Sequence, residues 1–221
     1  STPAVPVGPA GSFIASWTDG GDVWARRYDA SGMPLGDLDF LSNGTTIGAQ
    51  FNPALAMGAD SDFVAVWQSD DGDGWGIYGQ RFGSLGERLG SEFRVNTTTG
   101  AHQIEPAVSL DAAGNFVVVW AGGGCRDAVY AQRFDASGNR LGGEVLVGGG
   151  GCDQEPRLAT AADGSFVVSW FSDDGNSAGV YARRYDAQGV ALGDRFLVNT
   201  TVLGYQSESA LVMSASGDFV V

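Results

Sequence analysis

The chain has 221 residues, of which 43% are hydrophobic, which is enough for a substantial core and excludes a disordered polypeptide. The formal net charge is −14, from 26 acidic residues against 12 arginines and no lysine, so nucleic acid and anionic membranes are unsuitable partners. The single histidine, His102, excludes a histidine-rich zinc site, and we expect it in a loop.

One segment recurs from the N-terminus to the C-terminus. It follows a turn and contains Phe as its third residue and Trp as its last, and its copies are Gly11–Trp17, Ser61–Trp67, Gly114–Trp120 and Gly164–Trp170. A fifth copy, Gly217–Val221, stops where the Trp is due. The phenylalanines are spaced alternately by 50 and 53 residues. The chain is therefore predicted to consist of tandem repeats of about 50 residues.

Each repeat predicts four short strands. The first begins near a proline, as in Pro106-Ala107-Val108, and the second is the Phe…Trp segment, which is apolar enough to be buried on both faces. The third resembles Val129–Asp135 and the fourth resembles Glu92–Asn96. Between them, turns such as Asp29–Gly32 place Asp first and Gly fourth, which predicts a type I turn leading into a bulge. No segment keeps a helical period.

Four-stranded units in tandem predict an all-β fold, a β-propeller of four-stranded blades. We expect residues 1–221 to form a single propeller domain or a fragment of one, with repeats at 3–52, 53–105, 106–155, 156–208 and a half repeat at 209–221. A β-solenoid and tandem sandwiches are the alternatives. The half repeat predicts a longer array or self-association that completes the ring; a self-sufficient four-bladed ring is the alternative.

Two cysteines, Cys125 and Cys152, follow the second and fourth strands of the third repeat, at the same end of one blade. They predict a disulfide and an oxidising, extracellular location. Two unrelated free thiols are the alternative.

Two segments, Gln103–Trp120 and Val129–Gly142, carry a resemblance that extends over nearly the whole chain. They resemble tandem repeats of large secreted or surface-attached bacterial proteins, often adhesin-like. The resemblance implies a secreted β-propeller with a binding or scaffolding role, and it implies no catalytic residues.

The polar segment Ser69–Gly76 predicts a metal or sugar site. Asp71 and Asp73 have the alternate spacing that lets oxygens converge on Ca²⁺, and Asp174 and Asn176 are their counterparts in the fourth repeat. An EF-hand is excluded because Phe82 occupies the position of its bidentate glutamate. The alternative is a turn whose Asp and Gly residues satisfy backbone geometry.

Trp75 has no counterpart in the other repeats. An exposed indole beside Asp70 and Asp73 predicts stacking on a sugar, with the carboxylates binding hydroxyls. The alternative is that Trp75 folds back over a blade edge.

Two polar positions recur in the repeats. Arginines at one third-strand position predict hydrogen bonds or ion pairs between blades, with a channel for an anionic ligand as the alternative: Arg27, Arg81, Arg133 and Arg184. Asn-x-Thr sequences recur at one fourth-strand position and predict strand-end hydrogen bonds rather than glycan attachment: Asn43, Asn96 and Asn199.

No nucleophile–base motif accompanies His102. We therefore expect a non-catalytic extracellular binding propeller, lectin-like or adhesive, with a carbohydrate or protein ligand, and not an enzyme. A purely structural repeat of a large surface protein is the first alternative. A glycan-active enzyme is the second.

Overall fold

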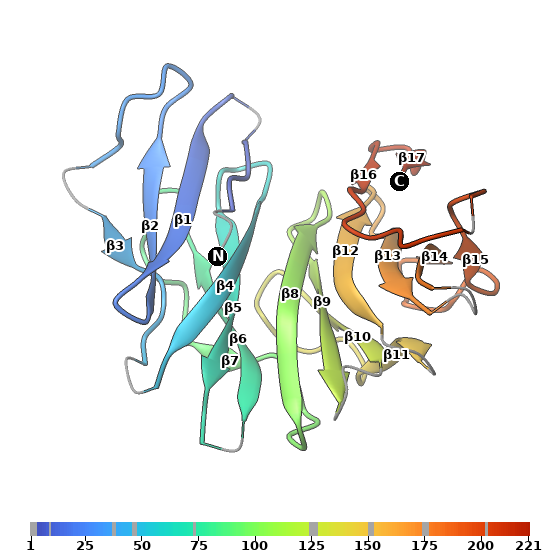
Figure 1. Ribbon diagram of the computed structural model, residues 1–221. Coiled ribbons are helices and arrows are strands. Elements are labelled where there is room, and N and C mark those ends of the chain that lie inside the picture. The colour runs from blue at the N-terminus through green and yellow to red at the C-terminus, as the bar shows by residue number, and fades with distance from the viewer. Residues whose placement is uncertain are drawn as a thin grey trace. The chain divides into compact units, whose positions relative to one another are not determined.

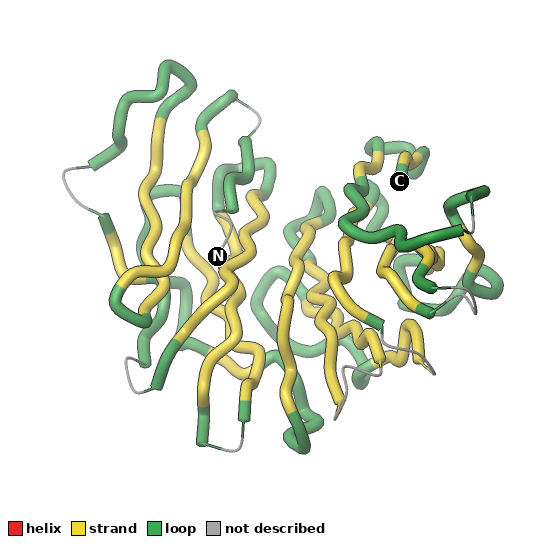
Figure 2. Tube along the Cα trace, viewed as in Figure 1, coloured by secondary structure: helices red, strands yellow, loops and turns green. Residues whose placement is uncertain are grey.

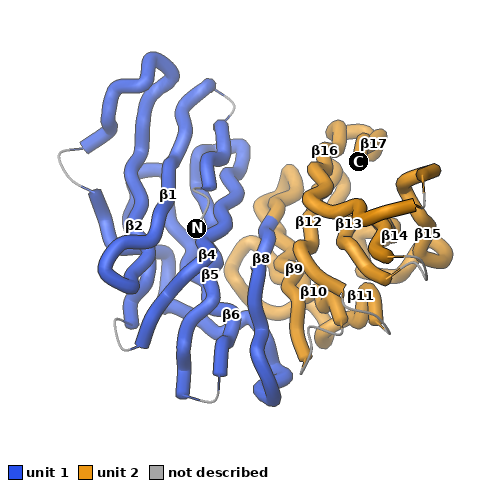
Figure 3. The backbone as a smooth tube through the Cα atoms, viewed as in Figure 1, with its two compact units in different colours: residues 1–108 blue, residues 109–221 orange. Residues whose placement is uncertain are grey.

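The computed structural model describes residues 4–8, 10–36, 39–45, 48–72, 74–123, 128–149, 153–173, 177–201 and 203–221. These residues form an all-β fold without helices, in which short antiparallel strands alternate with loops (Figures 1 and 2). Within this described part, no helix could span a membrane. The chain forms two compact units, residues 1–108 and residues 109–221 (Figure 3).

The first unit contains two antiparallel sheets, one from each of the first two repeats. A three-stranded sheet has the order β1-β2-β3, and its strands are β1 (Phe13–Asp19), β2 (Asp22–Tyr28) and β3 (Phe40–Leu41). A four-stranded sheet has the order β4-β5-β6-β7, and its strands are β4 (Gln50–Met57), β5 (Phe63–Asp70), β6 (Trp75–Phe82) and β7 (Phe93–Arg94).

The later repeats continue the same order of strands. One sheet has the order β11-β10-β9-β8, with β8 (His102–Leu110), β9 (Phe116–Gly123), β10 (Ala128–Phe134) and β11 (Val145–Gly149). The next contains β12 (Gln154–Thr160), β13 (Phe166–Ser172), β14 (Gly179–Tyr185) and β15 (Phe196–Leu197). A two-stranded sheet pairs β16 (Val212–Met213) with β17 (Phe219–Val220). The prediction of short four-stranded units is thus confirmed for three of the sheets.

An aromatic pair recurs at one end of each central hairpin. Phe63 and Phe82 face each other across β5 and β6, with ring centroids 4.7 Å apart and planes within 9°. The other repeats have centroid distances of 4.7–4.8 Å, in the pairs Phe13–Tyr28, Phe116–Phe134 and Phe166–Tyr185. Because directly opposed side chains stabilise an antiparallel register, these pairs fix the hairpin alignment.

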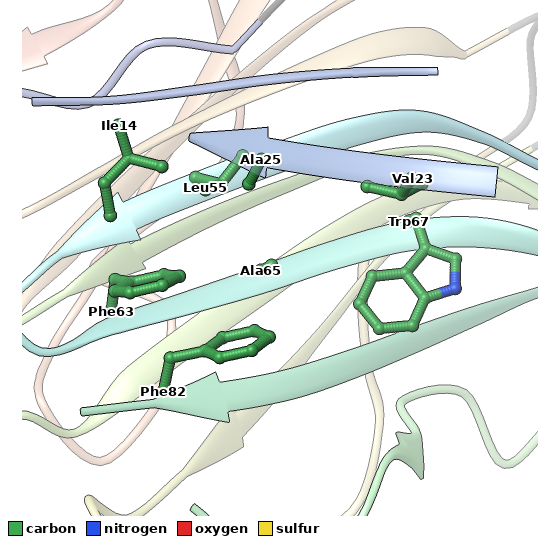
Figure 4. Packing of buried hydrophobic residues seen from close by; sticks show 8 residues of the cluster. All are labelled: Ile14, Val23, Ala25, Leu55, Phe63, Ala65, Trp67 and Phe82. Atoms are coloured by element: carbon green, nitrogen blue, oxygen red, sulfur yellow. The ribbon is translucent and has the colours of Figure 1, made fainter. Parts of the chain in front are cut away.

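The core of the first unit lies between its two sheets. Ile14, Val23 and Ala25 of the first sheet pack against side chains of the second, which Figure 4 shows as Leu55, Phe63, Ala65, Trp67 and Phe82. Trp67 has no exposed surface, so its side chain contributes only to this packing. The tryptophans that end the repeated segment are fully buried at Trp67, Trp120 and Trp170, whereas Trp17 is only partly buried.

The recurrent asparagines replace a backbone partner at a strand end. The Oδ1 atoms of Asn43, Asn96 and Asn199 accept the backbone N–H groups of Val23, Ile77 and Val180 at 2.7–2.8 Å. Their Nδ2 groups donate to the carbonyls of Thr45, Thr98 and Thr201. The predicted strand-end role is confirmed, and it accounts for the burial of Asn43 and Asn96.

Two of the recurrent arginines connect successive repeats. Nη1 of Arg27 donates to the carbonyl of Leu85 at 2.7 Å, and Nη1 of Arg133 donates to the carbonyl of Gln188. Each receiving turn contains a glycine at positive φ, Gly86 at 86° and Gly189 at 81°. A Cβ on Gly189 would lie 2.8 Å from Cδ of Arg133. The turn therefore has room for the arginine because residue 189 has no side chain. The predicted structural role between blades is confirmed for these two arginines.

Aspartate side chains organise the predicted turns. Oδ1 of Asp29 accepts the N–H groups of Ser31 and Met33, and Gly32 follows with a φ of 82°. Equivalent bonds occur around Asp135 and Asp186. A turn closed by the N–H of Gly32 on the carbonyl of Asp29 forms at the predicted place, and Gly supplies a residue with positive φ there.

One repeat position, within the first strand or just before it, carries an unusual backbone conformation. Four residues at one repeat position have positive φ although they are not glycine, and they are Asn52 (50°), Glu105 (57°), Glu155 (51°) and Glu208 (58°). In β4 and β12 this position coincides with an irregularity in the strand register. A left-handed conformation costs about 1–2 kcal/mol for an L-residue other than Gly or Asn, so the glutamates are strained.

The Asp29 turn predicts a specific acid sensitivity. Hydrogen bonds from the Ser31 side chain and the Met33 backbone lower the pKa of Asp29 below 3.8. A lowered folded-state pKa gives stability that is present above 3.8 and is lost as pH falls through the folded value. Urea unfolding should therefore show Asp29→Asn to be less stable than the unmodified chain at neutral pH, with the difference shrinking below 3.8. A difference independent of pH would contradict this linkage.

The positive φ of Glu155 predicts that Gly is more stabilising than Ala at this position, the reverse of the usual order inside a strand. Both Glu155→Gly and Glu155→Ala remove the side-chain contacts, but only Gly relieves the positive φ of 51°. The Gly variant should be more stable than the Ala variant by about 1 kcal/mol in urea unfolding. Gly and Ala at Val168, a buried position inside β13, provide the control, where Ala should be the more stable.

Candidate functional site

An acidic pocket of about 490 Å³ lies in the first unit, at the end of the blades where β5 leads into β6. Its walls come from four places in the chain: the segment before β4, the end of β5 with the turn that follows it, β6, and the residue before β7. The lining residues are Thr45, Gly48, Ser69, Asp70, Asp71, Gly72, Tyr78 and Glu92. Three carboxylates therefore face one cavity of a size that suits a small ligand.

Asp71 is the best-anchored carboxylate of this pocket. Its Oδ2 lies 2.7 Å from Nη2 of Arg94 and accepts a hydrogen bond from the Tyr78 hydroxyl at 3.3 Å. The Asp71 side chain is 13% exposed and the Arg94 side chain is 29% exposed, so the ion pair is only partly screened by solvent. The guanidinium carbon of Arg94 also lies 5.8 Å from the centroid of the Tyr78 ring. Arg94 and Tyr78 thus hold the Asp71 carboxylate in one orientation.

Arg94 departs from the repeat pattern. It faces Tyr78 across β6 and β7, and the same position opposite the other aromatic residues is leucine in each case: Leu41, Leu146 and Leu197. Gly76 leaves the space for the cluster, because a Cβ there would lie 2.6 Å from Oδ2 of Asp71 and 3.0 Å from Nη2 of Arg94. A feature found in one repeat is not required by the repeat fold, so this cluster is a functional candidate.

Tyr78 stays protonated in this setting. Burial raises its pKa above the usual 10.0; the Arg94 charge opposes this, and the charges of Asp71 and Glu92 add to it. The neutral phenol is therefore a hydrogen-bond donor at physiological pH, and the Asp71 carboxylate is its acceptor.

Backbone amides hold the other two carboxylates. Oε2 of Glu92 accepts the N–H groups of Gly44 and Thr45, and Oδ1 of Asp70 accepts the N–H of Gly72 at 3.2 Å. The Asp70 bond lies within the β5–β6 turn, as expected if the aspartates of this loop first shape a turn. Neither carboxylate forms an ion pair in the described part of the chain.

Trp75 does not join Asp70 and Asp71 at the pocket. It is the first residue of β6 and is half-buried, and its ring packs against Phe51 with centroids 5.5 Å apart and planes inclined by 51°. This contact matches the alternative in which the indole folds back over the blade. Its sugar-binding role stays a prediction.

His102 is an exposed residue at the start of β8 and not within a loop, which corrects the expected position. The first strand of the third repeat, β8, thus begins four residues before Pro106, the proline that was expected to mark its start.

Several predicted site residues lie outside the described residues. These are Asp73, Asp174 and Asn176 of the calcium prediction, and Cys125 and Cys152 of the disulfide prediction. Among the residues that are described, no group of three or more His, Cys, Asp or Glu side chains is arranged to hold a metal ion. Calcium binding and the disulfide therefore stay predictions.

No protein-family profile matches the sequence, and no curated protein sequence matches it. Many solved structures share its fold. An endo-arabinase from Bacteroides thetaiotaomicron VPI-5482 superposes with a TM-score of 0.58 at 14% identity, over 98% of this chain and 86% of the enzyme. An exo-β-1,3-galactanase from Phanerochaete chrysosporium gives 0.57 at 12% identity, over 89% of this chain and 49% of the enzyme. The α-L-arabinofuranosidase from Podospora anserina gives 0.53 at 8% identity, over 86% of this chain and 65% of the enzyme.

These similarities establish a β-propeller-like all-β fold, shared with glycoside hydrolases. The prediction of a non-catalytic binding or scaffolding propeller that is not an enzyme is corrected by this finding. It depended on the lack of a nucleophile–base motif, but cleavage of a glycosidic bond needs only carboxyl groups. Carboxyl groups from separate elements can meet without a local sequence motif, and Asp71 and Glu92 line the same pocket in this way.

The Asp71–Arg94 pair predicts a measurable coupling. Arg94→Leu introduces the residue of the other repeats and leaves the Asp71 carboxylate without its cation, which should destabilise the chain by about 1–2 kcal/mol. Combined with Asp71→Asn, it should cost less than the sum of the single changes, with a coupling energy of about 1 kcal/mol in urea unfolding. Additive effects would mean that the ion pair contributes no stability.

Proposed function

We propose that the chain is a glycan-active enzyme of the glycoside hydrolase type and that the acidic pocket is its substrate site. The observation that carries the proposal is the pocket with Asp70, Asp71 and Glu92, in a fold shared with an endo-arabinase and an exo-β-1,3-galactanase. Carboxylates accept the hydroxyl groups of sugars and also perform the hydrolytic chemistry. The substrate is accordingly a carbohydrate.

The proposal includes a closed propeller ring outside the cell. One antiparallel sheet for each repeat and the β-propeller-like similarity support the ring. The resemblance to secreted bacterial repeats supports the location. Polysaccharides of the kind named for the similar enzymes are extended polymers, and an extracellular enzyme meets them without transport.

The proposed chemistry divides the carboxyl groups by their partners. Glycoside hydrolysis uses one carboxylate, which activates water or attacks the sugar, and one carboxylic acid, which protonates the leaving oxygen. The 2.7 Å contact with Arg94 holds the Asp71 carboxylate in one orientation, so we assign the first role to Asp71. Tyr78 positions Asp71 through its hydroxyl. The proton donor is Asp70 or Glu92, which line the same cavity.

The test is release of reducing sugar from arabinan and β-1,3-galactan, with a chromogenic α-L-arabinofuranoside as a third substrate. Asp71→Asn should lower kcat by about 10²–10⁴-fold, and so should whichever of Asp70→Asn and Glu92→Gln removes the proton donor. Added azide can replace a missing carboxylate, so it should restore activity to Asp71→Asn and not to the variant that lacks the proton donor. Folding of each variant is checked by urea unfolding.

Asp60→Asn is the matched control, because Asp60 is exposed in the β4–β5 turn outside the pocket. Its activity should equal that of the unmodified chain. Turnover that survives in Asp71→Asn, or failure to hydrolyse any of the substrates, would count against the proposed function.

A further inference from the structure

A second pocket lies in the second unit and has the opposite charge character. It has a volume of about 570 Å³ and is lined by Leu146, Val147, Gly148, Gly149, Arg183, Asp194 and Arg195. Two guanidinium groups thus face one cavity in a chain whose net charge is −14. Leu146, which is 55% exposed, supplies an apolar wall.

Arg183 is fixed by backbone carbonyls. On β14, its Nε donates to the carbonyl of Gly193 at 3.1 Å, and its Nη1 donates to the carbonyl of Val147 at 3.4 Å. These bonds use only part of the guanidinium, which has five N–H donors. The side chain is therefore oriented before any ligand arrives.

Arg195 is fixed by an aromatic ring. Its guanidinium carbon lies 4.7 Å from the centroid of the Tyr181 ring, which places the planar group over the ring face. Stacking leaves the edge of a guanidinium available, and this edge binds carboxylate or sulfate oxygens in pairs.

The repeat pattern shows what is unusual about this arginine pair. In the first repeat the two positions hold Arg26 and Asp39, which form an ion pair of 3.2 Å. The position before the fourth strand is acidic in the second and third repeats as well, with Glu92 and Glu144. In the fourth repeat it is Arg195, so a charge reversal replaces the internal counter-ion of Arg183 with a second cation.

The pocket also lacks a substitute counter-ion. Asp194 lines it, but in the described part of the chain neither Arg183 nor Arg195 lies within ion-pair distance of a carboxylate. Two cations in one cavity repel each other unless an anion sits between them. A bound anion would receive hydrogen bonds from both guanidinium groups.

We propose that the Arg183–Arg195 pocket binds the carboxylate or sulfate group of an acidic saccharide. The oxyanion pairs with the two guanidinium groups, and the sugar ring lies against Leu146. The oxyanion part stands on the pocket alone, whereas the saccharide part rests on the proposed function. The pocket thus selects acidic glycans, by contacts separate from the carboxylates of the first unit.

The test is calorimetric titration of the whole chain at low salt with galacturonate, galactose 6-sulfate, galactose and inorganic sulfate. Either acidic sugar or both should bind, more tightly than inorganic sulfate, and galactose should not bind here. The informative variant is Arg195→Glu, which restores the acid of the other repeats and the Arg26–Asp39 type of ion pair with Arg183. It should fold at least as stably and bind the acidic sugars at least tenfold more weakly, which corresponds to about 1.4 kcal/mol.

Arg184→Glu is the control. Arg184 is exposed on the same strand but outside the pocket, and its substitution changes the net charge by the same amount as Arg195→Glu. It should retain most of the binding, with losses only from long-range charge. Binding of galactose as tight as that of galacturonate, no anion binding, or unchanged binding in Arg195→Glu would overturn the proposal. Equal affinity for inorganic sulfate and the acidic sugars would overturn its saccharide part.

The two proposals fail in distinguishable ways. Titration measures binding without turnover, so an inactive chain that binds galacturonate through Arg195 would retain this pocket and lose the proposed hydrolysis. Hydrolysis of arabinan without anion binding would give the reverse result.

Discussion

Burial of the second strand on both faces is the constraint from which the rest of the structure follows. In β5, β9 and β13 nearly every residue is buried, so the strand has no side that water can solvate. A strand of this kind needs hydrogen-bonded neighbours at both edges and packed layers on both faces. One repeat cannot supply both layers, which is why the chain repeats its sheet in tandem.

Tandem stacking also divides the side chains into two classes. Residues with a structural role recur from repeat to repeat, such as the stacked pair Phe63–Phe82 and the strand-end asparagine Asn96. Residues that depart from the repeat pattern are not needed to stabilise the repeated sheets. Arg94 stands where three repeats have leucine, and Arg195 stands where three repeats have an acid, and each departure lines or borders a pocket. The two sites thus have opposite charge on one common scaffold.

The sequence predicted the strands, turns and recurrent hydrogen bonds well because repetition displays them several times. Asn43 and Arg27 were assigned structural roles for this reason, and their partners in the structure agree. It did not predict the acidic cluster, since Asp71 comes from the β5–β6 turn, Tyr78 from β6 and Arg94 from β7, and they meet only through the antiparallel register. The expectation that the chain is not an enzyme was wrong for a related reason: carboxyl groups that act together need no adjacent positions in the chain.

The arginine contacts between repeats have an evolutionary consequence. Arg27 and Arg133 donate hydrogen bonds to backbone carbonyls in a turn of the following repeat, those of Leu85 and Gln188. They do not depend on the side chains of that turn. Every residue has a carbonyl, so the receiving turn can vary in sequence as long as it keeps its glycine. A repeat duplicated, deleted or exchanged by recombination would therefore meet a neighbour that already fits. Arrays of such units can change length without a matching set of compensating substitutions at each new junction.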